Sequence, residues 1–125
     1  MHLQKTADGV LVHAPAKLNL FFEVLNRRSD GFHEVETLVY PIDLYDTLIL
    51  SGQAGPRIDF RLFFASGDAV CRDVPEDSSN LVIRALELLR RRAGSEFGAR
   101  VCLRKRIPTA AGLGGGSSDA AAALA

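Results

Sequence analysis

The chain has 125 residues, of which 47% are hydrophobic and 24% charged, and its 15 basic residues balance its 15 acidic ones. This length suffices for one domain, and the composition is that of an ordinary soluble globular protein. A net charge of zero supplies no field to recruit nucleic acid or an anionic membrane, so neither is expected as a partner. The basic clusters at 90–92 and 104–106 adjoin predicted elements and are interpreted as a solvated helix end and a solvated strand end.

Cysteines and hydrophobic runs indicate the compartment. Cys71 and Cys102 lie far apart and have no metal-ligand spacing with the three histidines, so they are predicted to be reduced thiols. The N-terminus lacks the apolar core of a signal peptide, and no run approaches the ~20 apolar residues of a membrane span. We therefore expect a cytoplasmic protein. The sequence does not predict an oligomeric state.

The first clear element is a strand over residues 16–25, where side chains alternate between two faces. One face carries Lys17 and Asn19 side by side. The opposite face carries an apolar row: Leu18, Leu20, Phe22 and Val24. The dipeptide Asp30-Gly31 then supplies the positive φ of a tight turn.

Three more strands are expected before the first helix. Residues 34–38 and 47–50 are strand-like and are separated by Pro41 and the acidic segment 43–46. Residues 58–64 alternate most clearly of all.

A helix is predicted over residues 79–93, because an apolar stripe recurs there at helical spacing. Residues 78–80 (Ser-Ser-Asn) offer N-caps, and Gly94 suits the C′ position. A last strand over 99–103 follows, and a second helix is expected to begin near Ser118.

Between that strand and the second helix lies KRIPTAAGLGGGSSDAA, in which residues 112–116 contain four glycines. Glycines before a helix let backbone N–H groups surround an anion at the positive end of the helix dipole. Ser117 and Ser118 could cap that helix or donate to phosphate oxygens. The alternative is a tight turn with a purely structural role. The spacing fits neither a P-loop nor a dinucleotide-binding loop.

The order of elements predicts an α+β fold, in which a mixed or mostly antiparallel sheet is covered by helices. The second helix has only about two turns before the sequence ends, and helices shorter than ~12 residues are marginal by themselves. We therefore expect residues 1–125 to be one N-terminal domain, incomplete at its C-terminus, of a longer protein.

Three motifs occur in an order that resembles the GHMP small-molecule kinases. They are PAKLNL at 15–20, RSDGFHE at 28–34 and PTAAGLGGGSS at 108–118. The middle motif is similar to the branch that phosphorylates the 2-hydroxyl of 4-diphosphocytidyl-2-C-methyl-D-erythritol in non-mevalonate isoprenoid biosynthesis. The resemblance implies an ATP-dependent kinase whose ATP lies between two domains.

The resemblance also implies roles for individual residues. Lys17 matches the active-site lysine that orients the attacking hydroxyl and stabilises charge. Asn19 resembles a residue that positions substrate, and Phe32 and His33 resemble the pair that holds the cytosine. The loop residues that would wrap the ATP phosphates are Pro108, Thr109, Ala110, Ala111, Gly112, Leu113, Gly114, Gly115, Gly116, Ser117 and Ser118.

Two positions depart from the family pattern: Phe32 where tyrosine is frequent, and Ala110 where many relatives have glycine. The catalytic aspartate of the family belongs to a segment beyond residue 125, and so does its second domain. The resemblance therefore implies a fragment that is inactive alone. Mg²⁺ is the expected counter-ion of ATP. Its protein ligands are not predicted, and Asp119 is interpreted as a helix-start residue with metal ligation left open.

Two alternatives remain at this point. The chain could belong to another GHMP kinase with a different alcohol substrate. It could also be a non-catalytic module that binds a nucleotide or RNA through the basic clusters at 90–92 and 104–106.

Overall fold

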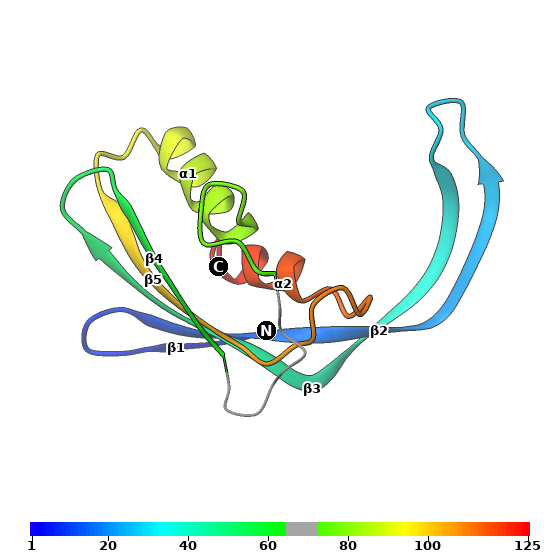
Figure 1. Ribbon diagram of the computed structural model, residues 1–125, viewed down its shortest axis with the longest axis horizontal. Helices are drawn as coiled ribbons and strands as arrows, with labels where there is room; N and C mark the ends of the chain where they lie inside the picture. The colour runs from blue at the N-terminus through cyan, green and yellow to red at the C-terminus, as the bar shows by residue number, and fades with distance from the viewer. Residues whose placement is uncertain (65–72) are drawn as a thin grey trace.

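The computed structural model describes residues 1–64 and 73–125 of the chain (Figure 1). The elements in this part are β1 (His2–Lys5), β2 (Val10–Arg27), β3 (His33–Gln53), β4 (Ile58–Phe64), α1 (Leu81–Ala93), β5 (Gly98–Lys105) and α2 (Gly115–Ala122). The predicted α+β class is confirmed.

The strands form one mixed sheet in the order β1-β2-β3-β5-β4. Neighbours are antiparallel except β4 and β5, which are parallel. A parallel pair needs a crossover connection, and α1 lies in the segment that joins these two strands. Both helices lie on the same side of the sheet (Figure 1), where α2 contacts β2 and β3 while α1 contacts β4.

The core lies between this face of the sheet and the two helices. Its buried members from the strands are Val12, Ala14, Leu48, Val101 and Leu103, and those from the helices and the residue after α2 are Val82, Leu86, Ala122 and Ala123. The strand members recur every second residue, and this spacing places them on one face of the sheet.

The caps of α1 agree with the sequence prediction. The Asn80 side chain accepts a hydrogen bond of 2.9 Å from the backbone N–H of Val82. Gly94 adopts φ 60° and its N–H bonds to carbonyls of the last turn. The helix therefore begins and ends where polar and glycine caps satisfy its free backbone groups.

One strand was not predicted, and one strand prediction was wrong. The strand β1 was not foreseen, and β3 continues through Pro41 and the acidic segment 43–46. Proline is tolerated because Pro41 faces Lys17 at a register shift in the β2–β3 pairing, where the ladder is already interrupted.

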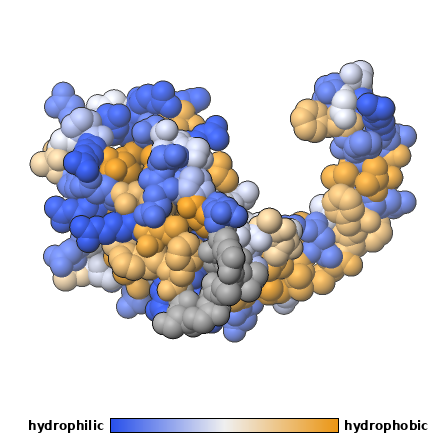
Figure 2. Space-filling view, in the orientation of Figure 1, coloured by the Kyte–Doolittle hydropathy of each residue, from blue (hydrophilic) through white to orange (hydrophobic). Residues whose placement is uncertain are grey.

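Beyond residue 17 the paired strands β2 and β3 leave the body as a long arm, residues 18–40 (Figure 1). The arm curves toward the side of the sheet that carries the helices. All its residues are exposed, and Figure 2 shows apolar side chains along it. The predicted apolar row therefore does not mark the core, because its members Leu18, Leu20, Phe22 and Val24 are 42–60% exposed.

Cys102 is a free thiol, and Cys71 lies outside the described residues. Neither helix in the described ranges, 1–64 and 73–125, is long and apolar enough to cross a membrane.

Candidate active site

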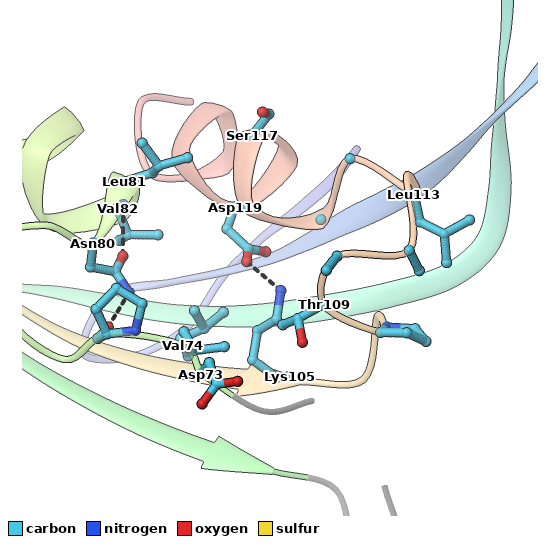
Figure 3. Close-up of a pocket in the computed structure, with 18 of the residues that line it drawn as sticks. Asp73, Val74, Asn80, Leu81, Val82, Lys105, Thr109, Leu113, Ser117 and Asp119 are labelled. Atoms are coloured by element: carbon cyan, nitrogen blue, oxygen red, sulfur yellow. Dashed lines mark hydrogen bonds and ion pairs between the residues drawn. The ribbon is translucent and has the colours of Figure 1, made fainter. Parts of the chain in front are cut away.

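A cavity of about 380 Å³ opens between the glycine loop, the start of α1 and the end of β5 (Figure 3). Pro108 to Ser117 line one part of it, and Val74, Pro75, Leu81 and Val82 line an apolar part. In Figure 3 the side chains of Lys105 and Asp119 lie between these two parts. The volume is within the range of small-molecule sites.

The glycine loop contains three residues in the left-handed conformation: Ala110 (φ 56°), Gly112 (φ 72°) and Gly114 (φ 72°). Gly114 is the N-cap of α2, which begins at Gly115. The predicted start near Ser118 was therefore wrong, and neither serine caps the helix with its side chain. Residues 115–117 form the first turn, whose N–H groups have no partners within a helix and lie at its positive end.

Lys17 is held directly against this loop. A register shift separates Pro15 from Lys17 in the β2–β3 pairing, and the Lys17 N–H donates instead to the Leu113 carbonyl at 2.9 Å. The Lys17 side chain crosses Gly114 so closely that a Cβ on that glycine would lie 3.0 Å from Lys17 Cγ. Glycine at position 114 therefore permits both the positive φ of the backbone and the close approach of the Lys17 side chain.

Lys17 and Asn19 share one face of β2, as predicted. The Lys17 ammonium donates a hydrogen bond to Asn19 Oδ1, and Asn19 Nδ2 donates to Thr37 Oγ1 at 2.6 Å. Within the described part of the chain, no carboxylate forms an ion pair with Lys17.

A buried ionic triad lies under the cavity. The Lys105 ammonium is 2.5 Å from Asp46 Oδ2 and 2.8 Å from Asp119 Oδ2. Asp46 Oδ1 also accepts the N–H groups of Arg106 and Ile107, at 2.6 and 2.9 Å. All three charged side chains are at most 3% exposed. Asp46 thus fixes the chain where β5 turns into the glycine loop.

Burial and the nearby charge of Asp46 raise the pKa of Asp119 to about 7, although Lys105 opposes the shift. Burial by itself would lower the pKa of Lys105, but the charges and hydrogen bonds of the two aspartates outweigh it and raise that pKa. Asp119 Oδ1 is buried and, among the described residues, has no hydrogen-bond partner.

No sequence motif predicts this triad. The interpretation of residues 104–106 as a solvated strand end is wrong for Lys105, which is 3% exposed. The signal was present in the alternation of β5, because Lys105 follows the buried Val101 and Leu103 at steps of two. In the same way Asp46 precedes the buried Leu48 by two residues. Asp119 is the fifth residue of α2 and not a helix-start residue.

The structure does not bring all predicted residues together. Phe32 and His33 lie at the tip of the arm, where Arg27 pairs with His33, while Lys17 pairs with Pro41 at its base. Arg27 lies ten positions beyond Lys17 in β2, which is roughly 33 Å along the path of the strand. Phe32 is 73% exposed.

Metal ligands are not clustered: in residues 1–64 and 73–125 no group of three His, Cys, Asp or Glu side chains could hold an ion.

Residues 80–125, which contain the glycine loop, α1, β5 and α2, match the family model for the GHMP kinases N terminal domain. The chain has the fold of a GHMP kinase N-terminal domain. The match confirms the resemblance found in the sequence. The mixed sheet with two helices, predicted from the order of elements, is confirmed by the structure itself.

Individual relatives point to one branch of these kinases. The chain is 52% identical over 116 residues to a 4-diphosphocytidyl-2-C-methyl-D-erythritol kinase of Synechococcus sp. (strain CC9311), with 92% of this chain and 35% of the relative aligned. It is 47% identical over 114 residues to the kinase of that name from Pelotomaculum thermopropionicum, with 89% and 36% aligned.

A crystal structure of 4-(cytidine 5'-diphospho)-2C-methyl-D-erythritol kinase superposes with a TM-score of 0.72 at 42% identity. The superposition covers 91% of this chain and 38% of that one. The chain therefore spans about a third of the length of the relatives that it matches.

Proposed function

We propose that this chain supplies the N-terminal, ATP-binding part of a kinase that phosphorylates the 2-hydroxyl of 4-diphosphocytidyl-2-C-methyl-D-erythritol. The observation that carries the proposal is the contact between Lys17 and the glycine loop. Among the described residues Lys17 forms no ion pair with a carboxylate, and its side chain lies against Gly114. The glycine loop with its three positive φ angles and the N-terminus of α2 line the cavity itself.

Electrostatics suggest how ATP would lie in the cavity. The first-turn amides of α2 contribute about half a positive charge, and Lys17 adds one more. Lys105 offers no further charge, because two aspartates already surround it. The phosphates would therefore lie at the Lys17 side of the loop, along residues Pro108 to Ser118. The adenine would occupy the apolar part beside Leu81 and Val82.

Lys17 would act on the phosphoryl group in transfer. Its ammonium is anchored by Asn19 and its stem by Gly114, so it presents a fixed positive charge where charge develops. Asn19, on the same face, would position the acceptor alcohol. A catalytic base is not assigned within this chain.

The cytidine end of the substrate would be held by the arm. Phe32 offers an exposed ring for stacking, and His33 could hydrogen-bond to the base edge. The arm curves toward the side of the sheet that carries the helices (Figure 1), so its concave side faces that side of the molecule. A closer approach of the tip to Lys17 would be needed to hold both ends of one small substrate.

Mg²⁺ would accompany ATP and neutralise part of its charge. Enzymes that act on ATP usually hold this ion through one or two carboxylates and the phosphate oxygens, not through a protein cage. No three His, Cys, Asp or Glu side chains in residues 1–64 and 73–125 form a site, so no dedicated protein cage for the ion is proposed. We place the reaction in the cytoplasm, as expected for a metabolic kinase.

The test is ADP release from Mg-ATP by the protein translated to its natural stop codon, with and without the cytidine substrate. We expect release that requires the substrate and falls at least about a hundredfold in Lys17→Ala, because a transition-state charge contact is lost. Release with another alcohol but not with the cytidine compound would assign a different GHMP substrate.

A further inference from the structure

We propose that Thr37 is a positioning residue: its hydroxyl sets the orientation of the Asn19 amide and thereby the place of the Lys17 ammonium. The inference rests on the proposed function, which gives Lys17 its part in phosphoryl transfer. Three consecutive hydrogen bonds carry it, from Lys17 to Asn19, from Asn19 to Thr37, and from Thr37 to the carbonyl of Phe21.

The direction of these bonds follows from proton counting. A threonine hydroxyl has one proton to donate, and Thr37 Oγ1 lies 2.7 Å from the Phe21 carbonyl, which can only accept. The hydroxyl proton is therefore committed to Phe21. What remains on Thr37 Oγ1 is acceptor capacity, and it faces the side chain of Asn19 at 2.6 Å.

This fixes which end of the Asn19 amide faces which neighbour. The NH₂ group must point to Thr37, since an oxygen there would meet another oxygen without a proton between them. The amide oxygen then points to Lys17, whose ammonium has only donors. The flipped amide would lose both hydrogen bonds, so the two ends of the network specify the same orientation.

The strand pairing explains why the Phe21 carbonyl accepts a hydrogen bond from a side chain. A register shift lies between Asn19 and Phe21, and such bulges interrupt the ladder and leave backbone groups available. Thr37 is the cross-strand partner of Phe22, directly beside that carbonyl. One hydrogen-bonded network at the base of the arm thus joins the bulge, Thr37 and Asn19.

This network lies in an exposed region, so we expect it to affect the orientation of the Asn19 amide more than the free energy of unfolding. Asn19 and Thr37 are both exposed, and water can replace their hydrogen bonds at little cost in unfolding free energy. Water does not select one orientation of the amide. Valine at position 37 keeps the branched shape but removes the hydroxyl, and serine keeps the hydroxyl.

The experiment compares Thr37→Val and Thr37→Ser in the protein translated to its stop codon. We expect kcat to fall about tenfold in Thr37→Val with the KM for ATP unchanged, and to stay within about twofold of wild type in Thr37→Ser. Thr47→Val is the matched control, because Thr47 also lies on β3 and bonds a β2 side chain, His13, in the body. Its kcat should remain that of wild type.

A second readout observes Asn19 itself. In ¹⁵N-labelled protein, the side-chain amide protons of Asn19, identified by their loss in Asn19→Asp, should exchange with water faster in Thr37→Val than in wild type or Thr37→Ser. Equal exchange in all three, or a wild-type kcat in Thr37→Val, would overturn this inference alone. A wild-type protein without substrate-dependent ADP release would overturn the proposed function and this inference together.

Discussion

Lys105 lines the cavity and Lys17 lies against Gly114 in its wall, and the surroundings of the two lysines are opposite. Lys105 lies in the body at 3% exposure, between two aspartates. Lys17 lies at the base of the arm, half-buried, with a neutral amide as the partner of its ammonium. A lysine whose charge is already matched by carboxylates holds the fold together. A lysine whose charge is unmatched is available to phosphate.

The strongest test of this contrast removes each ammonium by the same substitution. Lys105→Met leaves Asp46 and Asp119 facing each other without a cation, so we expect the free energy of unfolding to fall by about 3–5 kcal/mol. Lys17→Met should cost less than about 1 kcal/mol, because a half-buried site is screened by water. Urea unfolding of both variants gives the comparison.

Adding Asp119→Asn to Lys105→Met should recover part of the loss, since one of the two facing charges is then absent. Equal losses in the two single lysine variants would contradict the contrast between the lysines.

The pH dependence of the free energy of unfolding tests whether the pKa of Asp119 in the buried triad is raised. Because the pKa of Asp119 is raised to about 7 in the folded chain from 3.8, the folded state holds its proton where the unfolded state has lost it. The free energy of unfolding should therefore fall as pH rises from about 4 to about 7. Asp119→Asn lacks this contribution.

The difference in unfolding free energy between wild type and Asp119→Asn should change over that window by roughly 2–4 kcal/mol in favour of the variant. Urea titrations at pH 4.5 and pH 7.5 measure it. A difference that does not depend on pH would show that Asp119 keeps its ordinary pKa.

The smallest expected effect is at the loop that joins the two lysine sites. Ala110 has φ 56°, a conformation that costs a residue with a Cβ about 1 kcal/mol relative to glycine. Ala110→Gly should therefore raise the free energy of unfolding by up to ~1 kcal/mol. The neighbouring Ala111→Gly should lower it by about 0.4–1 kcal/mol, because only the unfolded chain gains freedom there. Thermal melts that move in the same direction would contradict this reading of the loop.

The sequence predicted the body better than the arm. Periodicity and capping residues located α1, β4 and β5, because burial against one core makes the apolar spacing regular. The alternation over residues 16–25 predicted a strand but not its exposure, since a period of two gives the local conformation and not what covers it. The continuity of β3 through Pro41 depends on a register shift with β2, which only the pairing reveals.

The candidate site was predicted in part for a similar reason. The glycine loop and Lys17 are carried by contiguous motifs, and the structure brings them into contact. The triad joins residues 46, 105 and 119, so no local motif contains it. Asp46 and Lys105 continue the rows of buried residues that recur at every second position of β3 and β5. That alternation was the sequence pattern from which their burial could have been predicted.

The central claim is that the loop beside Lys17 binds the phosphates of ATP, and calorimetric titration of ATP into the protein translated to its stop codon tests it most directly. Gly114→Ala and Gly116→Ala form a matched pair. A Cβ at 114 meets Lys17 at 3.0 Å and a positive φ, whereas a Cβ at 116 meets Leu81 at an ordinary 3.6 Å. We predict wild-type affinity within about threefold for Gly116→Ala and at least about tenfold weaker binding for Gly114→Ala. Wild-type affinity in Gly114→Ala, or no ATP binding by the unsubstituted full-length protein, would contradict the account.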